Sequence, residues 1–165
     1  MDTKSLFSEN ITREIDLIRS KFPVDKSKSA IIESLLIIQH DNNGFLSDEL
    51  IASLANYLDI QKIDVYEVAT FYSMFNLKPV GKNIISVCTN VSCMLRNSDG
   101  IVNHIEKRLK IKIGESTKDN KFYLKDEMEC LAACNGAPMM QVNHINYENL
   151  TTEKVDKILD EIAND

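Results

Sequence analysis

The 165-residue sequence has too little positive charge to suggest a nucleic-acid-binding protein. Its formal net charge is −6 and its pI is about 5.1, because 25 acidic residues outnumber 19 lysines and arginines. No basic run is longer than the pair Lys107-Arg108. Binding to a phosphate backbone requires a concentrated positive surface, so we expect no nucleic-acid partner.

Long hydrophobic runs are missing too. The longest unbroken aliphatic run covers residues 35–38, far short of the ~20 residues that span a bilayer. The N-terminus lacks the apolar core of a signal sequence and is too acidic for a transit peptide. With 44% hydrophobic and 27% charged residues, the composition is that of a soluble globular protein. We therefore expect a cytoplasmic protein without direct membrane insertion.

Glycine is scarce, and the few glycines do not form a nucleotide-binding loop. There are five glycines and no G-x-G pair, so we expect no Rossmann-type binding of NADH or flavin by this chain. No acid, base or nucleophile stands in a pattern that pairs it with a partner. The sequence therefore predicts no catalytic residue.

Residues 1–80 carry apolar residues at helical spacing and predict a four-helix bundle. The first helix follows from Ile11, Ile15 and Ile18, and the second from a similar stripe that ends at residues 41–44. Ser47 is a typical N-cap for the third helix. A fourth helix is indicated by a capping-box pattern at Asp64 and Glu67. The side chains expected to face inward from it are Val65, Val68, Phe71, Tyr72 and Phe75. Short connections favour an antiparallel bundle, which we expect to act as a docking domain.

Residues 81–165 alternate between strand and helix patterns. Strands are predicted at residues 83–88, 121–125, 139–143 and 145–147. Helices are predicted at residues 98–110 and after a cap at Thr151 or Thr152. A hairpin turn is expected at Asn143-His144. The fold class is therefore α/β, with the helical bundle followed by a small sheet domain of thioredoxin-like size.

The four cysteines form two pairs, Cys88-x4-Cys93 and Cys130-x3-Cys134. Each pair follows a predicted strand, so both pairs are expected at the same edge of the sheet. Structural disulfides are disfavoured in a reducing cytosol. Soft thiolates select iron–sulfur clusters, zinc or Cu(I), but zinc knuckles and redox dithiols usually have two intervening residues. The wider spacing favours a [2Fe–2S] cluster, and it leaves zinc and incidental buried thiols as alternatives.

Several neighbours of the cysteines suit such a site. Gly136 is expected to adopt a positive φ beside the metal. Thr89, Asn90 and Ser92, together with backbone N–H groups, are candidates for hydrogen bonds to sulfur. The acidic run at residues 126–129 precedes Cys130 directly, and its negative charge is predicted to hold the potential of a cluster low.

The residues flanking both cysteine pairs form two distinctive segments. Residues 88–96 read Cys-Thr-Asn-Val-Ser-Cys-Met-Leu-Arg, and residues 129–142 read Glu-Cys-Leu-Ala-Ala-Cys-Asn-Gly-Ala-Pro-Met-Met-Gln-Val. Together with residues 44–46, 71–75 and 147–151, they resemble the NuoE-type [2Fe–2S] subunit family of respiratory complex I, NADH:quinone oxidoreductase. The resemblance covers nearly the whole chain.

This resemblance implies a thioredoxin-like [2Fe–2S] ferredoxin domain at residues 81–165, with the helical domain at residues 1–80 packed against a larger partner. It implies that one cluster is held by Cys88, Cys93, Cys130 and Cys134. The implied partner is a flavin-bearing subunit that carries FMN and binds NADH within the peripheral arm of complex I. The complex would hold the chain at the inner membrane. His40, His104 and His144 match no ligand position.

Besides a zinc-stabilised interaction module with no redox role, two other functions remain open from the sequence. One is the equivalent subunit of an NAD-linked hydrogenase or formate dehydrogenase, which has the same family pattern. The other is a freestanding thioredoxin-like ferredoxin, although such a carrier has no evident need for a helical docking domain of this length.

Overall fold

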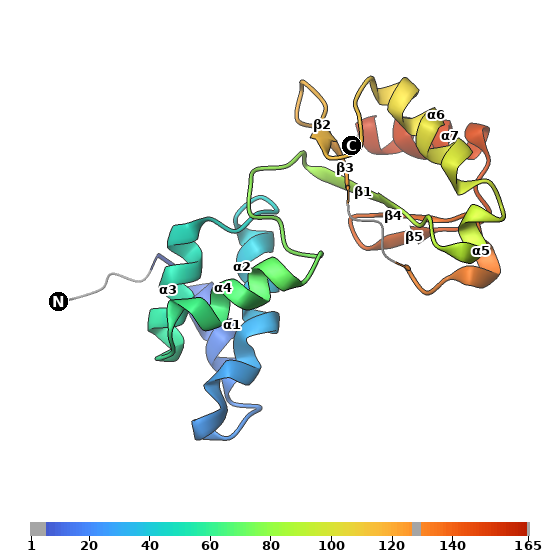
Figure 1. Cartoon of the computed structure of the whole chain (residues 1–165). Helices are drawn as coiled ribbons and strands as arrows, with labels where there is room; N and C mark the ends of the chain where they lie inside the picture. Colours follow the sequence, from blue (N-terminus) through green and yellow to red (C-terminus); the bar gives the residue numbers. More distant parts are fainter. Residues whose placement is uncertain (1–5, 127–129, 165) are drawn as a thin grey trace. The chain divides into compact units, whose positions relative to one another are not determined.

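The computed structural model describes residues 6–126 and 130–164. The chain divides into two compact units, Met1–Pro79 and Val80–Asp165. Figure 1 shows that the first unit is helical and that the second is built around a sheet. The predicted fold class, N-terminal helices followed by an α/β domain, is confirmed.

The helical unit contains the four predicted helices. Two of them begin at serine caps, because the Ile11 N–H donates to Ser8 Oγ over 3.3 Å and the Leu50 N–H donates to Ser47 Oγ over 3.2 Å. A 3₁₀ segment that the sequence analysis missed precedes the second helix. In chain order the elements are α1 (Glu9–Arg19), η1 (Val24–Ala30), α2 (Ile31–Asp41), α3 (Asp48–Leu58) and α4 (Lys62–Phe71).

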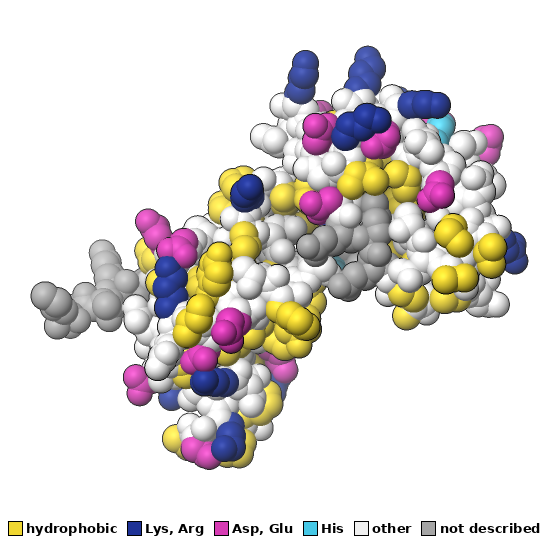
Figure 2. All heavy atoms as spheres, viewed as in Figure 1, with side chains coloured by type: hydrophobic (Ala, Val, Ile, Leu, Met, Phe, Trp, Pro, Cys, Tyr) yellow, Lys and Arg dark blue, Asp and Glu magenta, His cyan; other side chains and the backbone are white. Residues whose placement is uncertain are grey.

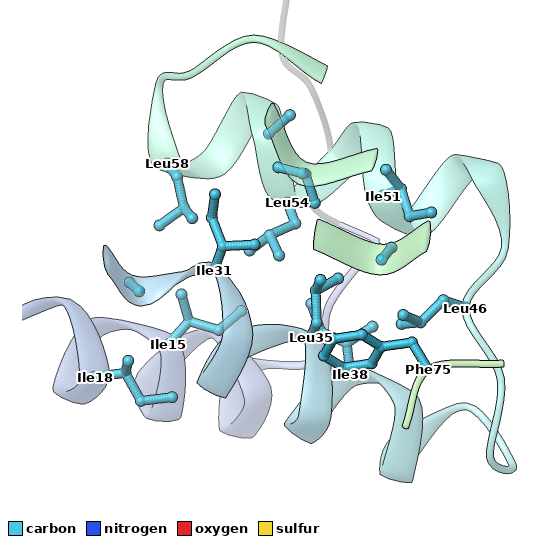
Figure 3. Close-up of a cluster of buried hydrophobic side chains, with 14 of the residues drawn as sticks. Ile15, Ile18, Ile31, Leu35, Ile38, Leu46, Ile51, Leu54, Leu58 and Phe75 are labelled. Atoms are coloured by element: carbon cyan, nitrogen blue, oxygen red, sulfur yellow. The ribbon is translucent and has the colours of Figure 1, made fainter. Parts of the chain in front are cut away.

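One aliphatic core joins these helices. Ile15 of α1, Leu35 of α2 and Leu54 of α3 are each fully buried. In Figure 3 these side chains point toward one another, and Leu46 and Phe75 come from the loops to close one end of the core. The spacing of apolar residues in the sequence was sufficient to predict this core, because each helix buries a single stripe.

The fourth helix differs from its prediction. It begins at Lys62, after Gln61, whose side chain makes no capping bond. Asp64 lies inside the first turn, so the predicted capping box is wrong. The prediction that Phe71 and Tyr72 face inward is also wrong, because these side chains are 80% and 39% exposed. Tyr72 is already extended, with φ −90° and ψ 121°, and helical periodicity therefore stops before Phe75 is brought into the core.

The second unit contains a five-stranded mixed sheet in the order β2-β3-β1-β4-β5. The central strand β1 pairs in parallel with β3, and the remaining neighbours are antiparallel. No sequence pattern indicated β2, which has only two residues and no alternating pattern. The strands are β1 (Asn83–Val87), β2 (Glu115–Ser116), β3 (Phe122–Leu124), β4 (Met140–Val142) and β5 (Ile145–Tyr147).

Two helices, α6 (Ser98–Leu109) and α7 (Thr152–Asn164), pack against the sheet. Their buried residues form one core with the alternate, inward residues of β1, β3 and β4. The Lys154 N–H donates to Thr151 Oγ1 over 3.2 Å, which identifies Thr151 as the cap of α7. Asn143 and His144 both have positive φ, as the predicted hairpin turn requires.

No helix within residues 6–126 and 130–164 is long and apolar enough to cross a membrane.

Candidate metal centre

The sheet topology places both cysteine pairs at one end of the sheet. Because β1 and β3 are parallel neighbours, their carboxyl ends lie at the same edge. Cys88 directly follows β1, and Cys130 lies on the chain beyond β3. The second member of each pair sits in a short element, Cys93 in α5 (Val91–Met94) and Cys134 at the start of η2 (Cys134–Gly136). Neither short element was predicted. Figure 1 shows α5 at the same end of the sheet as the orange segment that contains η2.

The four thiols interact with one another. The thiols of Cys93 and Cys130 donate hydrogen bonds to the Cys88 sulfur, and Cys134 lies close enough to Cys93 to act on it electrostatically. All four are free thiols. The inner pair, Cys88 and Cys93, is buried, whereas Cys130 and Cys134 are exposed. The structure therefore brings together the four residues that the sequence singled out, with one pair toward the protein and the other toward the surface.

Burial and hydrogen bonding have opposite effects on the two inner thiols. Burial raises the pKa of the Cys88 thiol, whereas hydrogen bonds from the N–H groups of Leu131 and Asn90 lower it. The thiols of Cys93 and Cys130 also donate hydrogen bonds to this sulfur, and the net effect of all these influences is to lower the pKa of Cys88 below its ordinary value. Burial and the hydrogen bond to Cys88 raise the pKa of Cys93, although the Met139 N–H donates to its sulfur. Of the two inner thiols, Cys88 is therefore the one that the site is better arranged to hold as a thiolate.

Backbone N–H groups are the contribution that sequence reasoning largely missed. Asn90 was a candidate and does contribute, through its backbone. Leu131 and Met139 gave no signal, because a backbone donor can belong to any residue type and its direction depends on the fold.

A small hydrophobic cluster surrounds the inner thiols and is separate from the main core of the sheet. It consists of Cys88, Cys93, Ala137 and Met139, with Leu131 packed against it and partly buried. Next to the site, α5 and the residue that follows it expose three large apolar side chains. They are Val91, Met94 and Leu95. The buried side of the site is thus lined by apolar side chains, and exposed apolar side chains lie next to it on the surface.

Gly136 has a different role from the one predicted. Its φ is not positive; instead, the non-glycine residue Ala132 has a φ of 56°. A Cβ on Gly136 would lie 2.5 Å from Glu148 Cβ, a distance that real contacts do not reach. Glycine is therefore required by the close approach of the Glu148 side chain, and not by backbone conformation.

Other sequence-based candidates fall outside this constellation. Glu127 and Glu129 of the acidic run lie outside the described residues. His104 hydrogen-bonds through Nε2 to Asp156 Oδ1 over 2.8 Å, a contact between α6 and α7. Within residues 6–126 and 130–164, no three His, Cys, Asp or Glu side chains form a group that could hold a metal ion. The site is therefore defined by interactions among the thiols. It is not a preformed binding site for a single metal ion.

Solved structures support the fold. An NAD+-reducing [NiFe]-hydrogenase in the air-oxidized state matches with a TM-score of 0.66 and 19% identity, over 79% of this chain and 23% of the hydrogenase chain. The same enzyme in the H2-reduced state matches equally well. This chain spans about a quarter of the length of those hydrogenase chains, and at this identity the likeness concerns the fold alone.

Sequence relatives cover the whole chain. The E subunit of the NADH-quinone oxidoreductase of Rickettsia bellii is 46% identical over 169 residues, covering 100% of both chains. NADH dehydrogenase [ubiquinone] flavoprotein 2, mitochondrial, of Dictyostelium discoideum is 41% identical over 156 residues, covering 94% of this chain and 62% of that protein. Residues 15–163 match the family described as thioredoxin-like [2Fe–2S] ferredoxin. The resemblance noted in the sequence is confirmed: the chain belongs to the thioredoxin-like [2Fe–2S] ferredoxin family, in the group of the NADH-quinone oxidoreductase E subunits.

Proposed function

We propose that this chain is the electron-transfer subunit of an NADH-quinone oxidoreductase and that it holds one [2Fe–2S] cluster. The observation that carries the proposal is that hydrogen bonds join three of the thiols near the carboxyl ends of two parallel strands, and that the fourth, Cys134, lies within electrostatic range of Cys93. The proposed ligands are Cys88, Cys93, Cys130 and Cys134. Full-length similarity to E subunits supports an NADH-quinone oxidoreductase as the complex in which such a site would work.

The donor set of this structure fits the cluster. Four thiolates satisfy two tetrahedral irons, two at each iron, and each pair is supplied by one loop. The N–H groups of Asn90, Leu131 and Met139 already point at the sulfurs of the inner pair. Such hydrogen bonds stabilise negative charge on sulfur. When bound, the cluster would take up and release one electron at a time, and apolar side chains of this chain would line its buried side.

The nucleotide and flavin sites are proposed to lie on a partner. This sequence has no G-x-G pair and no acid or base in a pattern that pairs it with a nucleophile. We infer that NADH is oxidised at the FMN of a flavin-bearing subunit in the peripheral arm, and that this chain exchanges electrons with it. The chain would then lie on the cytoplasmic side of the inner membrane, held there by the complex.

The helical unit offers a surface for such a partner. Three exposed apolar side chains, Ile63, Tyr66 and Phe71, lie on α4, and Phe71 packs edge-to-face on Tyr72 with ring centroids 5.1 Å apart. The same two rings line a shallow groove with Val68. Figure 2 shows hydrophobic side chains gathered on this unit over α4 and, on the second unit, around α5. Exposed apolar surface of this kind is typical of protein–protein interfaces.

Spectroscopy of the purified chain tests the cofactor. We expect visible absorbance and, after one-electron reduction, an electron paramagnetic resonance signal of a [2Fe–2S] cluster. A colourless protein with stoichiometric zinc would contradict the proposal. Gel filtration of a native extract distinguishes a subunit of a large complex from a freestanding ferredoxin. The subunit elutes with the complex, whereas the ferredoxin elutes as a small protein.

Replacing Phe71 with Glu tests the docking surface. Because this side chain is 80% exposed, we expect the stability to change by less than about 0.5 kcal/mol. Association should weaken by about 1 kcal/mol or more, because a charge would be buried in an apolar contact. Co-purification with the flavin-bearing partner measures the effect, and Leu17→Glu on α1, also exposed, is the control. Unchanged co-purification would remove α4 from the interface.

A further inference from the structure

A contact outside the cysteines reaches the loop that carries Cys134. Gly136 lies two residues beyond Cys134, and the side chain of Glu148 lies directly against it. The three atoms nearest to a Cβ at position 136 would all belong to this one side chain: Cβ and Cδ at 2.5 Å, and Oε2 closer still. The space that a side chain at position 136 would occupy is therefore filled by Glu148.

Backbone hydrogen bonds hold the two segments in this position. The Asn149 N–H donates to the Gly136 carbonyl over 2.6 Å, and the Leu150 N–H donates to the Pro138 carbonyl over 2.9 Å. From α7, Lys154 Nζ donates to the Glu148 carbonyl over 2.5 Å. The second cysteine loop, residues 130–138, is thus attached through residues 148–150 to the first turn of a helix that packs on the sheet.

The loop also has contacts of its own, because the Gly136 N–H donates to the Ala133 carbonyl over 3.0 Å and Ala137 is buried. Cys134 is exposed, and Ala132 adopts a left-handed φ of 56°, which is unfavourable for a residue with a Cβ. The hydrophobic cluster beneath the loop is small and separate from the main core. A contact from outside the loop therefore adds to its fixed shape on the side where the exposed Cys134 contributes little burial.

We propose that Glu148 is a positioning residue for the [2Fe–2S] site, acting through Gly136 on the loop that presents Cys134. The inference rests on the proposed function, because it concerns the geometry of a cluster ligand. Its mechanism is steric: the side chain fills the space over Gly136 and so fixes the distance between residues 148–150 and the loop. The amide of glutamine, which has the same shape, would serve equally well.

A double-mutant cycle on the full chain tests this role. The variants are Gly136→Ala, Glu148→Gly and the double variant, each reconstituted with iron and sulfide. We expect Gly136→Ala to lose its cluster to a chelator several-fold faster than the wild type and to change the shape of the electron paramagnetic resonance signal. The double variant should lose its cluster more slowly than Gly136→Ala, because none of the three crowding atoms remains. Such non-additivity is the signature of direct contact.

Two further variants separate packing from charge and from general surface effects. Glu148→Gln should keep the wild-type signal and rate, whereas Glu148→Gly should not. Glu161→Ala truncates an exposed glutamate of α7 whose partner is Lys157, and it should leave both readouts unchanged. Circular dichroism of each variant verifies folding, and if Gly136→Ala does not fold, the comparison of Gln with Gly at position 148 decides.

Three outcomes would overturn the inference. They are additive effects in the cycle, a wild-type signal and rate for Gly136→Ala, and a Glu148→Gln variant that behaves like Glu148→Gly. A wild-type chain that takes up no [2Fe–2S] cluster would instead contradict the proposed function, so the two failures are distinguishable.

Discussion

In the helical unit one aliphatic core holds all four helices together, whereas the described part of the second unit contains two separate hydrophobic clusters. The larger of these lies between the sheet and its two helices. The smaller surrounds Cys88 and Cys93 and includes two other buried residues, Ala137 and Met139. The proposed metal site is thus built beside a core, not within one.

This difference indicates how each unit is stabilised. Burial of complete isoleucine and leucine side chains contributes about 1.5–3 kcal/mol each, and the helical unit contains many of them. The second cysteine loop gains less from burial, because Cys130 and Cys134 are exposed while Cys88 and Cys93 of the first loop are buried. The shape of these loops depends on backbone hydrogen bonds, on Glu148 and, in our proposal, on the cluster itself. The helical unit should therefore fold without metal, and the cysteine loops should be the part most sensitive to its loss.

The largest expected effect comes from removing a proposed ligand. Cys130→Ala should abolish assembly of the [2Fe–2S] cluster, because four thiolates saturate two irons and the sequence has no fifth cysteine. Iron content and the electron paramagnetic resonance signal measure the loss. The helical unit should keep its circular dichroism, because its core contains no cysteine. A full-intensity signal in this variant would show that the ligand assignment is wrong.

Leu54→Ala in α3 tests the same contrast between the two units by destabilising the helical unit. Leu54 is fully buried, so its truncation should destabilise the helical unit by about 2–5 kcal/mol. Denaturant unfolding followed by far-ultraviolet circular dichroism measures this change. The visible absorbance of the cluster should persist at denaturant concentrations that unfold the helices.

An exposed position in the same unit provides the control. Leu17→Ala removes a leucine that is 66% exposed and should change stability by less than about 0.5 kcal/mol. If Leu54→Ala lost helicity and cluster absorbance in one transition, the two units would unfold together and their contrast would not hold.

Apart from that control, the smallest expected effect concerns Tyr57 of α3. Burial, followed by the hydrogen bond from its hydroxyl to Asp16 Oδ1 (2.6 Å) and the charge of Asp16, raises the pKa of Tyr57 from 10.0 to about 12. Because the folded pKa lies above the unfolded value, this stabilisation is complete below pH 10 and is lost as the pH rises through 12. Tyr57→Phe should cost about 1 kcal/mol at neutral pH.

The check is how the stability difference between the wild type and Tyr57→Phe depends on pH. The stability advantage of the wild type over Tyr57→Phe should be constant up to about pH 10 and should then decrease toward pH 12. A constant difference across this range would mean that the phenol and Asp16 do not interact in solution.

Most of the fold could be predicted from local patterns. The isoleucine spacing of α1, the cap at Ser47 and the turn at Asn143-His144 each depend on a few neighbouring residues, and the structure confirms them. Three of the missed elements have a common cause. The two-residue strand β2, the four-residue α5 that holds Cys93 and the three-residue η2 that begins at Cys134 are too short to show a periodic pattern.

The sequence by itself determined the two cysteine pairs, the order of the helices and strands that it predicted, and the family. These depend on residue identity and spacing, which are written in the chain. Tertiary structure alone decided that Cys88 and Cys93 are buried while Cys130 and Cys134 are exposed. It also decided that position 136 must be a glycine, because Glu148, twelve residues further along the chain, lies against it. Burial and close approach are properties of pairs of residues that only folding brings together.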